Sequence, residues 1–211
     1  MNMTRVSEMV ITPYEGGIFR LTSKIGYRNV PEIGLINNPH YGVDLVGVSS
    51  KNITCVGAGT VGWAGYRDDK SSGGATWQWG NYVRVDMDDG RSMYYCHMSA
   101  VKCTVGQKVI VGTILGTEGA TGQATGSHLH LELRRGARKC VLPASDTDEC
   151  NSAAYIGITN SAGLYRAEDP IEAIIDECRL SSTWKAPMTQ FQSAYPYGYQ
   201  FWRKIAEELK R

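Results

Sequence analysis

Short apolar stretches separated by Gly, Asn and Asp run through most of the chain. Several of them alternate between polar and apolar side chains, as residues 127–134 do in Ser-His-Leu-His-Leu-Glu-Leu-Arg. Alternation with a period of two is typical of a β-strand that buries one face. The pattern predicts strands at 17–22, 43–48, 52–58, 60–65, 80–87, 91–98, 108–111, 113–118 and 127–134.

Turn residues between these stretches support an all-β fold built mainly from an antiparallel sheet. Asp88-Asp89-Gly90 predicts a hairpin turn between the strands at 80–87 and 91–98. Residues 66–78 predict a loop that leads to Trp79. Two interpretations of Trp77 and Trp79 stay open: they extend over a bound substrate, or they cover an edge of the core.

The C-terminal part of the chain has a different pattern. Apolar residues at helical spacing predict a short helix at 168–179 and a second at 199–210. We therefore expect a lead-in at 1–17, a domain at 18–178, and an aromatic tail at 179–211 that ends in a helix. The tail either packs on the domain or docks onto a partner, such as a component of a virion.

Composition excludes several classes of partner. The 211 residues carry a formal net charge of +1, so nothing points to nucleic acid or to an anionic membrane. The sequence has no apolar run of eighteen residues, so we expect no membrane insertion. The N-terminus lacks the apolar segment of a secretory signal peptide. The oligomeric state is not readable from the sequence.

All four histidines fall in three short motifs. The motifs are His40-x-x-x-Asp44, His97 within Tyr-Tyr-Cys-His-Met, and His128-Leu-His130. Imidazole nitrogens with a carboxylate are typical zinc ligands, and a catalytic site keeps one position open for water. The motifs predict one zinc site with more imidazoles than its ligand set requires.

Alternation in the last motif places its polar residues together. His128, His130 and Glu132 are expected on one face of the strand at 127–134. Glu132 is better interpreted as a partner that orients a ligand than as a catalytic acid. A glycine and a β-branched residue between His40 and Asp44 disfavour a helix, so a turn that enters a strand is expected there.

In their order and context these motifs resemble the lysostaphin-type zinc endopeptidases, which cut peptides in bacterial peptidoglycan. The resemblance covers about residues 18–176. It extends to Leu21-Thr22-Ser23-Lys24-Ile25-Gly26-Tyr27-Arg28, Gly42-Val43-Asp44-Leu45, Ala58-Gly59-Thr60-Val61, Gly80-Asn81-Tyr82-Val83, Gly122-Gln123-Ala124-Thr125-Gly126-Ser127-His128 and Asp169-Pro170.

The resemblance implies a role for each residue of the motifs. His40, Asp44 and His130 would hold Zn²⁺ at the floor of a narrow groove, and His97 and His128 would flank the reacting water. Some members have a tyrosine six residues before the first zinc histidine, where this chain has Gly34. Tyr27, Tyr41 and Tyr95 are the candidates to replace it.

The resemblance also implies the reaction and its location. The chain would hydrolyse peptide bonds in the stem cross-link or the interpeptide bridge, at the bacterial cell wall. Without a signal peptide, a phage origin is favoured over a removed signal, with delivery during host lysis or on a virion. The alternative is a latent or non-catalytic peptidoglycan-binding or virion-associated module. Residues 136–166 are longer than the family needs, and predict an insertion that forms a hairpin near the groove.

Six cysteines do not form a Cys-x-x-Cys pair, so a structural zinc knuckle is not expected. Cys140 and Cys150 flank a polar stretch and could join its ends, while buried free thiols are the other interpretation. Cys96 lies between Tyr95 and His97, and strand alternation predicts that it faces away from the metal.

Overall fold

The computed structural model describes residues 12–158 and 162–166 and has the predicted all-β fold. Its largest sheet has eight strands in the order β10-β6-β7-β8-β12-β4-β1-β13, and every pairing is antiparallel. The strands are β1 (Ile18–Ser23), β4 (Val43–Gly47), β6 (Gly59–Tyr66), β7 (Asn81–Met87), β8 (Ser92–Met98), β10 (Lys108–Val109), β12 (Leu129–Arg134) and β13 (Gly163–Arg166).

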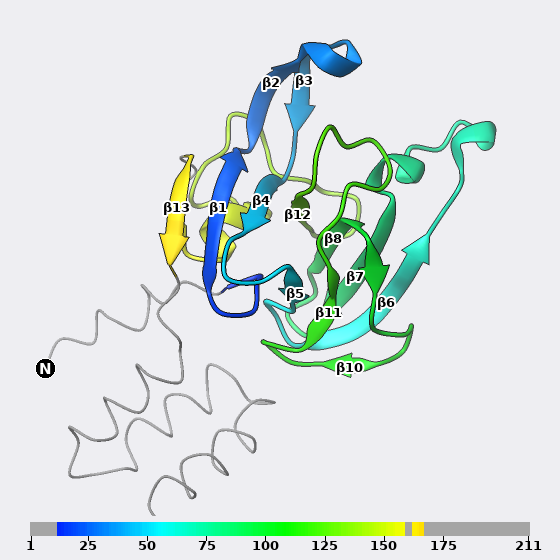
Figure 1. Cartoon of the computed structure of the whole chain (residues 1–211), viewed down its shortest axis with the longest axis vertical. Helices are drawn as coiled ribbons and strands as arrows, with labels where there is room; N and C mark the ends of the chain where they lie inside the picture. Colours follow the sequence, from blue (N-terminus) through cyan, green and yellow to red (C-terminus); the bar gives the residue numbers. More distant parts are fainter. Residues whose placement is uncertain (1–11, 159–161, 167–211) are drawn as a thin grey trace, which may run out of the picture. The chain divides into compact units, whose positions relative to one another are not determined.

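Two smaller sheets complete the described strands. β5 (Asn52–Thr54), β11 (Ile114–Thr117) and β9 (Ala100–Val101) form one, and β2 (Gly26–Val30) pairs with β3 (Leu35–His40) in the other. The β2–β3 hairpin and the segment between β6 and β7 both project from the body of the sheet (Figure 1). Helical turns are short: η2 (Pro31–Ile33), η3 (Lys70–Ser72), η4 (Thr76–Trp79) and α1 (Ser152–Tyr155).

One face of the eight-stranded sheet carries the hydrophobic core. Leu129, Leu131 and Leu133 of β12 are fully buried, and they share one cluster with Ile53 of β5 and Leu115 of β11. Alternation therefore sends the polar residues of β12 to the opposite face. This division is what the sequence pattern predicted for the strand.

The hairpin turn at 88–90 is also confirmed. The Gly90 amide donates to the Met87 carbonyl at 3.0 Å, and the φ of Gly90 is +81°. Glycine adopts this left-handed conformation without the steric cost that a Cβ would bring. The structure adds four strands that the pattern did not predict, β2, β3, β9 and β13. The predicted strand at 52–58 is shorter, because it ends at Thr54.

The segment that follows β12 begins with a tight hairpin turn, in which Arg135 and Arg138 pair and exchange two backbone hydrogen bonds of 3.1 Å. A loop and α1 follow, and Lys139 Nζ lies 4.4 Å from the ring centroid of Tyr41, the neighbour of His40. Cys140, Cys150, Ala153 and Ile156 join the hydrophobic core. Burial of these apolar side chains draws the segment onto the core. The predicted helices at 168–179 and 199–210, and the tail at 179–211, lie outside the described residues.

The described cysteines are free thiols. Cys55, Cys96, Cys103, Cys140 and Cys150 are all buried and unpaired, while Cys178 lies outside the described residues. Among the alternatives for Cys140 and Cys150, the structure has buried thiols. In residues 12–158 and 162–166 we find no helix with the length and apolar character needed to cross a bilayer.

Candidate metal centre

Three neighbouring elements bring the predicted ligands together. His40 is the last residue of β3, Asp44 lies in β4, and His130 lies in β12, which pairs with β4 so that His130 is opposite Asp44. Opposite residues of an antiparallel pair point to the same face. Gly42 forms the turn between His40 and Asp44, and any Cβ there would lie 2.5 Å from the Leu131 carbonyl.

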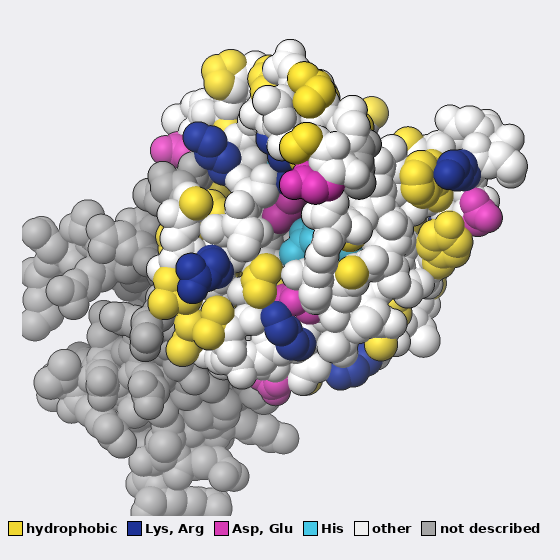
Figure 2. Space-filling model, turned by 45° about the horizontal axis from the view of Figure 1, so that its top comes forward, with side chains coloured by type: hydrophobic (Ala, Val, Ile, Leu, Met, Phe, Trp, Pro, Cys, Tyr) yellow, Lys and Arg dark blue, Asp and Glu magenta, His cyan; other side chains and the backbone are white. Residues whose placement is uncertain are grey.

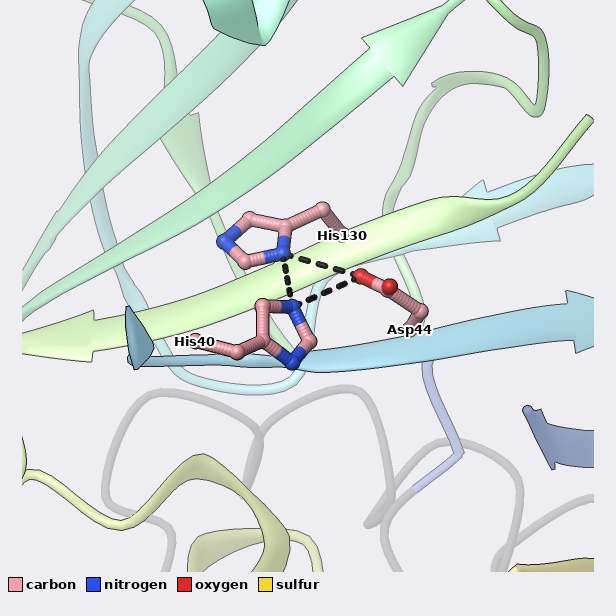
Figure 3. Close-up of side chains that lie close together, drawn as sticks. All are labelled: His40, Asp44 and His130. Carbon is pink, nitrogen blue, oxygen red and sulfur yellow. Dashed lines mark hydrogen bonds and ion pairs between the residues drawn. The ribbon is translucent and has the colours of Figure 1, made fainter. Parts of the chain in front are cut away.

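The three donor atoms form a nearly equilateral triangle. His40 Nε2 lies 3.0 Å from Asp44 Oδ1 and 2.9 Å from His130 Nδ1, and His130 Nδ1 lies 3.0 Å from Asp44 Oδ1 (Figure 3). Zinc ligands at about 2.0–2.1 Å in a tetrahedral site lie about 3.3 Å apart. The triangle is therefore close to the size of three zinc ligands, and its donor set of two imidazoles and a carboxylate suits Zn²⁺.

Hydrogen bonds fix the tautomers of both imidazoles. His40 Nδ1 lies 2.9 Å from the Lys24 carbonyl, which can only accept, so Nδ1 carries the proton. The Nε2 lone pair of His40 then faces the triangle. His130 is turned the other way, with Nε2 lying 3.4 Å from Glu132 Oε2 and Nδ1 facing the triangle. Glu132 thus orients a ligand, as the sequence predicted.

Asp44 offers one oxygen to the triangle and uses the other elsewhere. Arg28 of β2 donates from Nη1 to Asp44 Oδ2 and, at 2.7 Å, to Ser23 Oγ. Although burial disfavours the carboxylate, His40 and His130 hold the pKa of Asp44 well below its usual range. The sequence analysis missed Arg28, because no local pattern links it to a carboxylate sixteen residues away.

Burial and neighbouring charges shift the pKa values of the two imidazoles in the triangle in opposite directions. Burial lowers the pKa of His40 below its ordinary value, and the attraction of Asp44 only partly offsets this. Burial acts in the same direction on His130, but hydrogen bonds to Asp44 and Glu132 outweigh it and raise the pKa to about 9. Burial acts to raise the pKa of Glu132, but its hydrogen bonds to His130 and Arg134 outweigh this and lower the pKa to about 2.

His97 and His128 lie beside the triangle. Their ring centroids are 4.6 Å apart, and His128 Nε2 lies 3.7 Å from Asp44 Oδ1. His97 Nδ1 donates to the Thr121 carbonyl at 2.9 Å, and His128 Nδ1 donates to the Gly126 carbonyl at 2.8 Å. These bonds select the tautomer in which Nδ1 is the N–H and Nε2 faces the centre. Burial, helped by the neighbouring His130 and His128, lowers the pKa of His97 to about 3.

One prediction about this face is wrong. Cys96 pairs with His130 in the β8–β12 register, so the two side chains point to the same face and not to opposite ones. Strand alternation ends at His97, whose φ is +65°, a conformation that is rare for a residue with a Cβ. The backbone turn at His97 brings His97 to the same face as Cys96, whereas Met98 lies in the core. Tyr95 keeps the alternation and lies in the core, which removes it as a candidate to replace the absent tyrosine.

An aromatic cluster continues the same sheet face away from the triangle. Trp79 packs on Tyr82 and Tyr94, with ring centroids 5.1 Å away in both cases, and the Arg134 guanidinium lies 4.8 Å above the Trp79 ring. Trp77 lies under Lys70 in the projecting segment. Neither tryptophan belongs to the core cluster. Figure 2 shows histidine side chains (cyan) in a surface hollow with acidic side chains (magenta) nearby, which agrees with the predicted groove.

Comparison with known proteins identifies the class. The model of peptidase family M23 matches residues 38–142, a span that contains all five residues of the centre. Lysostaphin of Staphylococcus simulans is 33% identical over 111 residues, which cover 51% of this chain and 20% of lysostaphin. The chain belongs to peptidase family M23. The predicted resemblance is confirmed, and the chain spans about one fifth of the length of lysostaphin.

Two solved structures are similar to this chain. The catalytic domain of a prophage-encoded M23 protein from Enterococcus faecalis is 30% identical, with 60% of this chain and 88% of that chain covered and a TM-score of 0.48. A zinc-containing peptidase from Vibrio cholerae is 25% identical, with 63% and 38% covered and a TM-score of 0.50.

Proposed function

We propose that this chain is a zinc endopeptidase that hydrolyses peptide bonds in bacterial peptidoglycan, in the stem cross-link or the interpeptide bridge. The observation that carries the proposal is the convergence of three donor atoms within 3.0 Å, with two further imidazoles beside them. Membership of family M23 and the similarity to lysostaphin support the substrate class.

His40, Asp44 and His130 are the proposed metal ligands. Zinc, when bound, lowers the pKa of water to about 7 and polarises a carbonyl group. The protein contributes the orientation of the donors: the Lys24 carbonyl and Glu132 fix the two imidazoles, and Arg28 restrains Asp44. The zinc-containing relative from Vibrio cholerae supports this choice of metal.

His97 and His128 are the proposed catalytic residues. Each holds its Nδ1 proton on a backbone carbonyl and keeps Nε2 free, so each can take a proton from water at Nε2. The protonated ring can return that proton to the leaving amine. The other ring can stabilise the oxyanion of the tetrahedral intermediate only as its cation, in which Nε2 carries a second proton and can donate it in a hydrogen bond. A contribution of about 10²–10⁴ in rate is usual for such groups.

An enzyme is favoured over the latent or non-catalytic module. A module that only binds has no need of five buried or half-buried ligand and base positions, and each position here holds the residue that the chemistry requires. The proposed place of action is the cell wall.

Digestion of purified cell walls tests the proposal. The zinc-loaded protein should release new free amines and no new reducing sugar ends, and EDTA or 1,10-phenanthroline should stop the reaction. Asp44 and Glu132, the two carboxylates at the centre, both contact His130, so neither is placed as the free proton donor of a glycosidase. Reducing ends released in the presence of chelator would reject the peptidase, and cleavage of casein but never of walls would reject the substrate class.

A further inference from the structure

One loop orients both of the proposed catalytic histidines. Residues 119–127 connect β11 to β12, and the two carbonyls that accept from the His97 and His128 Nδ1 atoms, those of Thr121 and Gly126, both belong to this loop. The His128 amide also donates to the Gly119 carbonyl at 3.0 Å. The direction of each free Nε2 therefore depends on the conformation of this loop.

The loop has little in its own sequence to hold that conformation. Three of its nine residues, Gly119, Gly122 and Gly126, are glycines, and most of the others are small and polar. Glycine loses more conformational freedom on ordering than any other residue. Most residues of the loop are exposed or half-buried, so core packing does not fix them. Hydrogen bonds from outside the loop have to supply the restraint.

Glu118 directly precedes the loop, and its side chain contacts Ser127 at the end of the loop. Its side chain is fully buried, and Oε1 accepts from Ser127 Oγ and from Lys51 Nζ, both at 2.7 Å. Its other oxygen, Oε2, lies 2.7 Å from Tyr14 Oη and accepts from the Gly47 amide at 2.8 Å. Three of the four partners belong to other parts of the domain, and they fix the carboxylate. The fourth, Ser127, is the last residue of the loop.

Thr121, which orients His97, is held independently of Glu118, because its Oγ1 accepts from the Asn81 amide at 2.9 Å and donates to the Met98 carbonyl at 2.8 Å. We propose that Glu118 is a positioning residue whose carboxylate, through Ser127, fixes the end of the 119–127 loop and thereby aims His128. The inference rests on the proposed function for its effect on rate, and it adds a residue outside the ligand and base set. Charge-assisted hydrogen bonds are about twice as strong as neutral ones, so a buried carboxylate suits this role. Glu118 itself touches neither the triangle nor the substrate.

Two substitutions each remove one hydrogen bond to the same atom, Glu118 Oε1, and so form a matched pair. Ser127→Ala removes the loop's bond to Glu118 Oε1, whereas Lys51→Met removes a bond to the same oxygen from a half-exposed side chain outside the loop. Ser127→Thr restores the hydroxyl. The measurements are zinc content, kcat and KM for amine release from purified walls, and amide hydrogen exchange of residues 119–128 by mass spectrometry, all on the zinc-loaded full chain.

We expect Ser127→Ala to keep its zinc and its KM but to lose kcat by roughly ten- to a hundredfold, because small misplacements of catalytic groups have effects of that size. Exchange in the loop should rise in the same variant. Lys51→Met and Ser127→Thr should resemble the unmodified protein in both respects.

Two results would overturn the inference. The first is unchanged loop exchange and kcat in Ser127→Ala, and the second is an equal loss in Ser127→Ala and Lys51→Met, which would assign Glu118 to general stability. If the unmodified protein fails to cleave walls, the proposed function is refuted, but the role of Glu118 in restraining the loop is not. The exchange comparison still decides whether Glu118 restrains the loop.

Discussion

Zinc binding should release a proton from His130. In the metal-free protein the pKa of His130 is about 9, since contacts with Asp44 and Glu132 outweigh the effect of burial. The proton on Nδ1 lies between His130 and Asp44 Oδ1, 3.0 Å away, which is where a metal ligand needs its lone pair. Zinc and this proton therefore compete for one nitrogen atom.

The size of the effect follows from that pKa. At pH 7, about one His130 ring in a hundred is neutral, so the apparent zinc affinity should be about 100-fold below its value at high pH. The apparent zinc affinity should fall about tenfold for each pH unit below 9. The other two ligands add little at neutral pH, because burial keeps His40 neutral and its neighbours keep Asp44 ionised.

Isothermal titration calorimetry measures the released proton directly. Zinc is titrated into metal-free protein at pH 6, below the range in which zinc ionises water, in two buffers that differ in ionisation enthalpy. We expect about one proton for each zinc bound. Release close to zero would refute the assigned tautomers, and release of two would indicate that a further protonated imidazole enters the ligand set.

The same pKa makes a prediction about stability. A pKa raised above the ordinary value of 6.5 stabilises the metal-free fold fully below pH 6.5, and this contribution is lost as the pH rises through about 9. Chemical denaturation of the metal-free protein should therefore show declining stability from pH 6.5 to 9. In the zinc-loaded protein His130 must be deprotonated, so its contribution to stability should rise with pH up to about 6.5 and stay level above that.

Four further substitutions test other parts of the site and the core. His97→Ala and His128→Ala should keep zinc, as measured by elemental analysis, and lose about 10²–10⁴ in kcat; loss of metal in either variant, with retention in His40→Ala, would reverse the assignment. Glu132→Gln should weaken zinc about 10–100-fold in a competition assay with a chromogenic chelator, because a ligand's orienting partner is lost; unchanged affinity would mean that the 3.4 Å contact with His130 has no role. Leu131→Ala, in the fully buried face of β12, should lower the free energy of unfolding by about 2–5 kcal/mol in urea denaturation, and a loss under about 1 kcal/mol would contradict the packing described.

Local patterns in the sequence determined the elements that carry the site. Alternation in 127–134 gave the strand, its buried face of three leucines, and the shared direction of His130 and Glu132. Turn residues gave the hairpin at 88–90, and the spacing of the histidines and Asp44 gave the candidate ligands and the family. These features are readable because burial of one face and tight turns each impose a short-range rule on residue type.

Other strands left no such rule in the sequence. The residues of β2 and β3 are half-buried or exposed along most of their length, so they show no apolar alternation, and both strands escaped prediction. In the segment at 136–158, a few apolar residues are enough to place part of it against the core.

Only the tertiary structure decided how the centre is oriented. Which ring nitrogen faces the triangle depends on carbonyls and carboxylates from other segments, such as the carbonyl of Lys24, sixteen residues from His40. Cys96 shares the face of His130 by strand register, and His97 reaches the same face because the backbone turns there, with a positive φ that no residue type announces. Glu118 meets Tyr14 across 104 positions of the chain. Contacts of this kind form between segments that meet only after folding, and spacing along the chain carries no record of them.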